Sequence, residues 1–178
     1  MARTSIADIL TLIGSQITEE GASDARERLR AFLGQDKWSP DDLNAWINEC
    51  LELASRARPE FYYALQDLII SIGGQLGFEV EYGSYTSTGA EIPYDGRWHA
   101  LCGADLLIEV KTSPWPLRSA SQLGQYMDEY ALAAGLAPRS VFGLYAIGHG
   151  DFSSLVDQIR GSEYRSRIKV VAFTDLIR

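Results

Sequence analysis

The segment from Ala104 to Ser113, ADLLIEVKTS, constrains the fold of this chain more than any other stretch. Its residues alternate between apolar and mostly polar types, which is the pattern of a β-strand whose two faces meet different surroundings. On the polar face, Glu109 and Lys111 lie side by side, about 6.6 Å apart along the strand. A salt bridge at the protein surface is the simplest explanation of such a pair. A catalytic role therefore needs support from the neighbouring sequence.

A hairpin turn predicted at Leu101–Gly103 brings another acidic residue to this pair. If the turn is centred on Cys102, Asp95 lies directly opposite Glu109 in an antiparallel strand pair, with Cβ atoms ~4.5–5.5 Å apart. A shift of the register by one residue would break this alignment. Asp105 lies on the same face of the strand as Glu109 but roughly 13 Å away along it. We therefore interpret Asp105 as a residue that marks the start of the strand.

Two carboxylates at this distance repel each other unless a cation lies between them. Mg²⁺ and Mn²⁺ prefer oxygen ligands and keep bound waters, so Asp95, Glu109 and the backbone carbonyl of Val110 form a suitable ligand set. Such an ion lowers the pKa of a bound water and neutralises charge on a phosphate oxygen. Lys111 would orient that water and stabilise the pentacovalent phosphate.

The stretch YDGRWHALCGADLLIEVKTS resembles the motif of the PD-(D/E)xK nuclease superfamily. Asp95 takes the place of the first acid, and Glu109, Val110 and Lys111 take the place of the E-x-K triplet. Tyr94 stands where the motif has proline. The resemblance implies a nuclease with Asp95, Glu109 and Lys111 as catalytic residues, Mg²⁺ as cofactor with Mn²⁺ as its substitute, and DNA rather than RNA as the substrate.

A second motif strengthens this resemblance. Gln122 and Tyr126 are four residues apart in a predicted helix, so they share one helical face. A Q-x-x-x-Y after the E-x-K strand is similar to the RecB-like and type I restriction-subunit nucleases, in which the pair contacts the nucleic acid backbone. The alternative is a solvated Gln122 and a core Tyr126. In such nucleases the helix before the sheet often adds one more acid, and here Gln66 is a weak candidate for holding a water on the metal.

Residues 1–57 are predicted to form an N-terminal helical segment. Apolar residues recur at helical spacing after Ser5, Ser23 and Ser39. Ser39 followed by a proline and two aspartates is the clearest helix start, because it combines an N-cap, a proline at the first position and acids in the first turn. We expect these helices to pack on the main domain or on a partner.

Residues 58–178 are predicted to form a nuclease-like domain. A helix starts near Pro59 and ends before Gly77, which tolerates the left-handed conformation at a helix end. The following patterns indicate strands at 78–85, 93–101 and 104–112, a helix at 119–135, a strand at 140–148, a helix at 152–164 and a strand at 167–174. This order predicts an α/β fold with a mixed sheet flanked by helices, and its α-β-β-β-α-β core resembles that of restriction endonucleases.

Charge and composition limit the class of protein. The net charge is −8, and nearly all of it lies in the first 90 residues. Proteins that bind DNA tightly on their own are usually basic, so we expect DNA affinity to come from a homodimer or a separate DNA-recognition subunit. No secretion signal or membrane span is predicted, and Cys50 and Cys102 read as buried thiols, so a cytoplasmic location is expected.

Three functions stay open from the sequence. The first is a metal-dependent endonuclease that hydrolyses DNA, with a role in prokaryotic restriction or anti-phage defence suggested by the resemblance alone. The second is a catalytically inactive module that keeps the nuclease fold and acts in protein assembly. The third is hydrolysis of another phosphate ester by the same ion chemistry.

Overall fold

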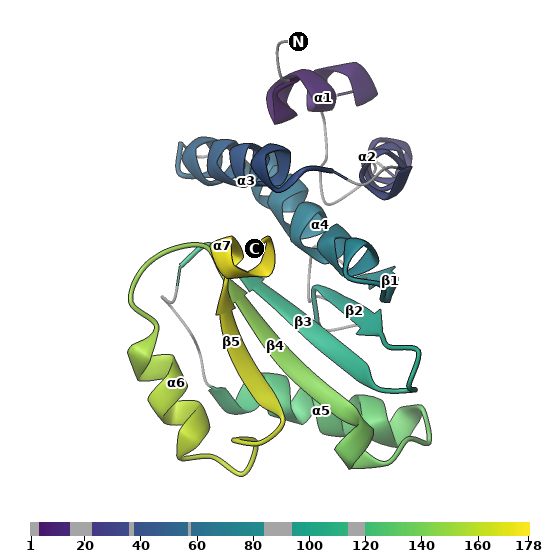
Figure 1. Cartoon of the computed structure of the whole chain (residues 1–178), viewed down its shortest axis with the longest axis vertical. Coiled ribbons are helices and arrows are strands. Elements are labelled where there is room, and N and C mark those ends of the chain that lie inside the picture. The colour runs from purple at the N-terminus through teal and green to yellow at the C-terminus, as the bar shows by residue number, and fades with distance from the viewer. Residues whose placement is uncertain (1–3, 15–22, 36–37, 57, 84–93, 114–119) are drawn as a thin grey trace.

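The computed structural model describes residues 4–14, 23–35, 38–56, 58–83, 94–113 and 120–178. The first half of the chain is helical (Figure 1), with α1 at Ile6–Ile13, α2 at Ser23–Gln35, α3 at Pro40–Ala54 and α4 at Pro59–Gln75. The second half contains β1 at Glu79–Tyr82, β2 at Gly96–His99, β3 at Asp105–Lys111, α5 at Ala120–Ala133, a 3₁₀ turn at Pro138–Ser140, β4 at Val141–Ile147, α6 at Ser153–Arg160, β5 at Ile168–Ala172 and α7 at Phe173–Leu176.

The helix ends follow from local capping chemistry. The Ser5 hydroxyl accepts a hydrogen bond from the Asp8 backbone N–H at 3.0 Å, and Ser39 accepts one from Asp42 at 3.1 Å. Both bonds satisfy an N–H group that the first turn of a helix leaves without a partner. After α4, Gly77 adopts a φ of 90°, the left-handed conformation expected of a glycine at a helix end.

The five strands form one sheet in the order β1-β2-β3-β4-β5. β1, β2 and β3 pair antiparallel, whereas β3, β4 and β5 pair parallel. The parallel strands are joined through helices, as parallel connections require. The prediction of an α/β fold with a mixed sheet is therefore confirmed.

The β2–β3 hairpin has the predicted register. Gly96 pairs with Ile108 and His99 with Asp105, so the turn is centred on Cys102. Gly103 adopts a φ of 82° in this turn, and its N–H donates to the Ala100 carbonyl at 2.8 Å. A residue without a Cβ meets the least strain in that conformation. The regular pairing ends at Gly96, and the Asp95 N–H donates to the carbonyl of Ile108, one residue short of the predicted partner Glu109.

Helices cover both faces of the sheet (Figure 1). α4 packs against β1, β2 and β3, and α2 and α3 pack on the outer side of α4. One hydrophobic core runs from α1–α3 through α4 to this face, where it includes Ile108 and Val110. α5 and α6 cover the other face, whose core includes Leu107 and Tyr145. The polar face of β3 is therefore the one that α5 approaches.

Two features differ from the sequence expectation. The last predicted strand was expected to reach Thr174, but β5 ends at Ala172 and the short helix α7 follows, with Phe173 buried in the α4-side core. Cys50 is buried as expected, whereas Cys102 is exposed because it lies in the hairpin turn. The first predicted strand is observed as β1, and its residues 84–85 lie outside the described residues. No helix in the described ranges is long and apolar enough to cross a membrane.

Two adjacent glycines in α4 provide a test of how tightly the helix packs on the sheet. A Cβ at Gly73 would lie 2.3 Å from Nε1 of the buried Trp98 indole, whereas a Cβ at Gly74 would make only an ordinary contact with Val80 at 3.8 Å. We expect Gly73→Ala to lower the free energy of unfolding by about 1–3 kcal/mol through overpacking. Gly74→Ala should leave it unchanged or raise it by up to about 1 kcal/mol, because alanine favours the helix. Urea denaturation of both variants measures these changes in the free energy of unfolding. Equal changes in the two variants would contradict the close packing of Gly73 against Trp98.

Candidate active site

Asp95 is attached to β3 through both its backbone and its side chain. Its N–H donates to the carbonyl of Ile108 at 3.1 Å, the residue that also pairs with Gly96 at the end of β2. Its carboxylate Oδ2 accepts a hydrogen bond from the Val110 N–H at 2.6 Å. These two bonds fix the carboxyl group beside the strand segment that carries Glu109 and Lys111.

Glu109 and Lys111 form an ion pair on the α5-side face of β3. The Lys111 Nζ lies 2.6 Å from Glu109 Oε1, and the two side chains are 31% and 16% exposed. Burial alone would lower the pKa of Lys111, but the carboxylates of Glu109 and Asp95 outweigh it and raise that pKa above its usual value. The other oxygen, Glu109 Oε2, is buried and has no hydrogen-bond partner among the described residues. A buried carboxylate oxygen without a partner is costly, and a bound cation or water would satisfy it.

The Asp95 carboxyl group is held in a setting that disfavours its charge. Burial is the largest cause and the neighbouring Glu109 carboxylate is the second, and together they raise the pKa of Asp95 to about 8. Lys111 and the Val110 N–H act in the opposite direction but do not cancel them. Two carboxyl groups that compete for ionisation in this way become compatible when a cation joins them.

The ligands available here suit a hard divalent cation. In a β-strand the N–H and C=O of one residue point to the same side. The Val110 carbonyl therefore points to the side of the strand where its N–H meets Asp95. Among the described residues, no group of three or more His, Cys, Asp or Glu side chains could hold a metal ion. An ion at this place would thus be held by the carboxylates of Asp95 and Glu109, the Val110 carbonyl and waters, a set of oxygens that fits Mg²⁺ or Mn²⁺.

One face of α4 borders the same place. The Gln66 side chain is buried, and its Nε2 lies 3.5 Å from the Asp95 carbonyl oxygen, so it contacts the backbone of Asp95. Tyr62 lies one turn earlier on α4, and its pKa is raised by burial and then by the charge of Asp95, with Glu109 adding to the effect. The sequence analysis missed Tyr62, although its i−4 spacing from Gln66 was a usable signal.

Gln122 and Tyr126 share one face of α5, as their spacing predicts. The Gln122 Nε2 donates to the Tyr126 hydroxyl at 2.6 Å, and both side chains are half-buried. Tyr145 pairs with Glu109 in the sheet, and its pKa is raised to about 12 by burial and by Glu109, with a smaller contribution from Tyr126. Tyr145 therefore links the α5 pair to the Glu109 side of the site.

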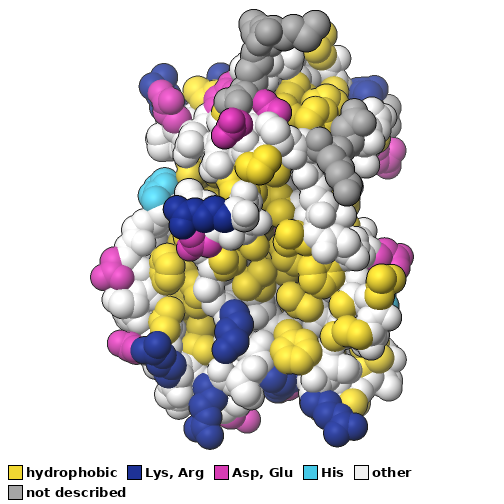
Figure 2. All heavy atoms as spheres, viewed as in Figure 1, with side chains coloured by type: hydrophobic (Ala, Val, Ile, Leu, Met, Phe, Trp, Pro, Cys, Tyr) yellow, Lys and Arg dark blue, Asp and Glu magenta, His cyan; other side chains and the backbone are white. Residues whose placement is uncertain are grey.

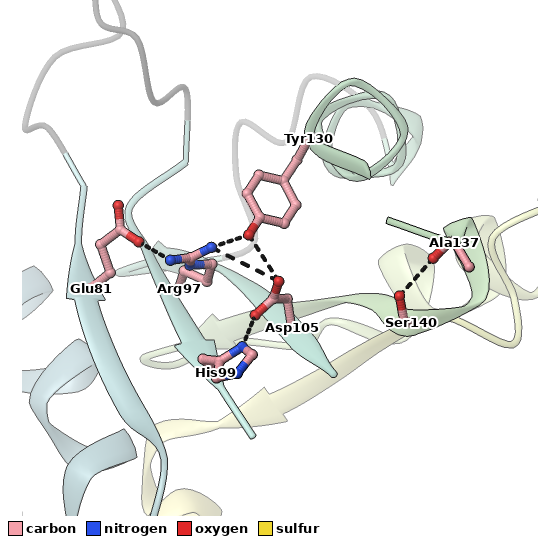
Figure 3. Close-up of polar contacts among 7 residues, drawn as sticks. All are labelled: Glu81, Arg97, His99, Asp105, Tyr130, Ala137 and Ser140. Carbon is pink, nitrogen blue, oxygen red and sulfur yellow. Dashed lines mark hydrogen bonds and ion pairs between the residues drawn. The ribbon is translucent and has the colours of Figure 1, made fainter. Parts of the chain in front are cut away.

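A second polar cluster occupies the opposite end of the same sheet face (Figure 3). The buried Asp105 carboxylate accepts a hydrogen bond from the Tyr130 hydroxyl at 2.8 Å and lies 2.6 Å from His99 Nδ1. Arg97 bonds to the Tyr130 hydroxyl and pairs with Glu81 of β1. The cluster thus ties β1, β2 and β3 to α5, so Asp105 does more than begin a strand.

The turn centred on Cys102 pairs His99 directly with Asp105, so this contact could have been found from the predicted hairpin register. Asp67 of α4 is fully buried and bonded to Arg30 of α2. The two residues are 37 positions apart in the chain, and no local pattern reveals their contact.

Comparisons with known proteins add no assignment for this chain. No protein-family model matches it. A search of curated proteins also finds no significant match. The candidate site therefore has to be judged from its own geometry.

The raised pKa of Asp95 makes the stability of the metal-free protein depend on pH. Between about pH 4 and pH 8 the folded protein keeps a proton on Asp95 that the unfolded chain has lost, so the free energy of unfolding falls as pH rises. Asp95→Asn removes this titration. We expect the free energy of unfolding of the variant, relative to that of the wild type, to increase as pH rises. The increase between pH 5 and pH 8 should be at least about 1 kcal/mol.

Denaturation curves in EDTA at pH 5 and pH 8 measure this difference. Asp157→Asn serves as the control, because Asp157 is 73% exposed and its ion pair with Arg160, at 3.5 Å, lies at the surface. A stability difference between Asp95→Asn and wild type that does not change with pH would contradict the raised pKa.

Proposed function

We propose that this chain is a divalent-metal-dependent endonuclease that hydrolyses phosphodiester bonds in DNA. The observation that carries the proposal is the joint placement of Asp95, Glu109 and Lys111 at one end of the β2–β3 hairpin, where a buried oxygen of Glu109 lacks a partner within the described part of the chain. The order of helices and strands supports it, since the mixed sheet is consistent with the restriction-endonuclease-like fold that the sequence motif resembles.

The roles of the side chains follow from their charges. Asp95, Glu109 and the Val110 carbonyl would hold Mg²⁺ or Mn²⁺, and such an ion supplies an activated water and neutralises charge on a phosphate oxygen. The Val110 N–H keeps the Asp95 carboxylate in place through its 2.6 Å bond. Lys111 stays charged because two carboxylates raise its pKa, so its ammonium group can stabilise the additional negative charge of the transition state.

Groups from both flanking helices can contact the nucleic acid. Gln122 and Tyr126 lie on α5, which packs on β3 and β4, and Tyr62 lies on α4, where Asp95 and Glu109 affect its pKa. In the nucleases that the Q-x-x-x-Y motif resembles, the corresponding pair contacts the backbone. Contacts of this kind position the strand without reading its sequence, so the proposed cleavage has no built-in sequence preference.

The charge of −8 means that DNA affinity has to be supplemented. Figure 2 shows Lys and Arg side chains standing apart on the lower half of one face, which in Figure 1 includes α6 and the start of β5. In this region Arg160, Arg165 and Lys169 are exposed, but Arg160 pairs with Asp157, so the positive charge is partly neutralised. We therefore propose a homodimer or a separate DNA-recognition subunit, in a prokaryotic restriction or anti-phage system.

Cleavage of supercoiled plasmid tests the proposal. With Mg²⁺ or Mn²⁺ the wild type should nick or linearise the plasmid, and EDTA should abolish the reaction. Glu109→Gln and Lys111→Met should each lower the rate at least about 10²-fold, because each removes a charge that acts on the transition state. Glu129→Gln, which changes an exposed acid on α5, should keep the wild-type rate.

The outcomes separate the alternatives. Activity that persists in both site variants would contradict the assigned residues. A folded wild type that cleaves neither DNA nor RNA, nor any nucleotide, would favour the inactive assembly module. Hydrolysis of nucleotides in preference to DNA would favour the third function, another phosphate ester.

A further inference from the structure

Arg30 of α2 reaches from the N-terminal helices to the helix that borders the candidate site. Its Nε and one terminal nitrogen bond to the two carboxylate oxygens of Asp67 at 2.8 and 2.9 Å. Asp67 is fully buried in α4, next to Gln66. A bidentate pair of this kind fixes both the distance and the orientation of its partners.

The same guanidinium also bonds to the end of β1. An Arg30 terminal nitrogen donates to the Gly83 carbonyl at 3.2 Å, and the group lies 4.5 Å from the centre of the Tyr82 ring. The Gly83 N–H in turn donates to the Asp95 carbonyl at 2.9 Å. A continuous chain of hydrogen bonds thus runs from α2 through Gly83 to the backbone of Asp95.

Gly83 lies so close to Asp95 that no larger residue fits. A Cβ at Gly83 would lie 2.1 Å from the Tyr94 carbonyl oxygen and 2.8 Å from the Asp95 carbonyl carbon. Both neighbours are backbone atoms, which cannot rotate away as a side chain can. A shift of Gly83 is therefore transmitted directly to Asp95.

We propose that Arg30 is a positioning residue for Asp95, so that the N-terminal helices form part of the scaffold of the active site. Arg30 holds Gly83, Gly83 holds the Asp95 backbone, and the Asp95 carboxylate then meets the Val110 N–H. The inference rests on the proposed function, because that function makes Asp95 a metal ligand. Loss of Arg30 should loosen the Asp95 carboxylate and weaken the binding of a divalent ion.

The test needs a variant that removes Arg30 without leaving a buried charge. Arg30→Met combined with Asp67→Leu replaces the pair by apolar side chains, a change that is often neutral or stabilising for a buried ion pair. Amide hydrogen exchange by NMR, in EDTA, then reports on Gly83 and Val110. We expect both amides to exchange at least about tenfold faster than in wild type. The Gly143 amide, bonded to the Arg167 carbonyl in another part of the sheet, should be unchanged.

Calorimetric titration with Mn²⁺ gives a second readout. We expect the double variant to bind Mn²⁺ about 10- to 100-fold more weakly, the usual effect of losing a residue that orients a metal ligand. Arg56→Gln is the matched control, since it breaks an exposed ion pair with Glu52 on α3 in the same part of the chain. This control should retain both the wild-type exchange rates and the wild-type Mn²⁺ affinity.

The readouts distinguish failure of this inference from failure of the proposed function. Wild-type exchange at Gly83 and Val110 in the folded double variant would overturn the role of Arg30, whatever the activity. If the double variant does not fold, amide exchange at Gly83 and Val110 is measured in Arg30→Lys instead. Lysine keeps the positive charge, but its single ammonium group cannot bond to Asp67 and Gly83 with the geometry of the arginine guanidinium. A wild type that binds no Mn²⁺ would count against the nuclease alone, since the exchange measurement uses no metal.

Discussion

The antiparallel register of β2 and β3 is the constraint on which the rest of this structure depends. The turn centred on Cys102 pairs His99 with Asp105, and its continuation brings Asp95 to the segment of Glu109 and Val110. One register therefore creates two polar centres on a single face of the sheet. A shift of the register by one residue would turn the side chains of one strand to the other face of the sheet. The polar contacts of both centres would then be lost.

The two centres solve the problem of buried charge in different ways. At the Asp105 end, the carboxylate is matched by His99, by the Tyr130 hydroxyl and, at 3.9 Å, by Arg97, and the cluster joins the sheet to α5. Arg97 Nε is buried there without a hydrogen-bond partner among the described residues, but the Asp105 carboxylate is fully matched. At the other end, a Glu109 oxygen has no partner among the described residues, and the pKa of Asp95 is raised. The first arrangement suits stability, and the second suits binding of a cation.

Much of the architecture could be predicted from local sequence. The caps at Ser5 and Ser39, the glycine that ends α4 and the alternation along β3 each act within a few residues, and the structure has these features. The hairpin register was also predictable, because a tight turn fixes which residues face each other.

Contacts between distant elements could not be predicted in the same way. Arg30 and Asp67 lie on different helices, and Tyr130 meets Asp105 only after α5 has folded back over the sheet. Periodicity shows that a helix has a buried face but does not show which polar group will lie within it. The hairpin tip has a practical consequence: Cys102 is an exposed thiol, whereas Cys50 is buried and its pKa is raised. A maleimide dye would react selectively at this tip, giving the unmodified sequence a built-in attachment point for fluorescence.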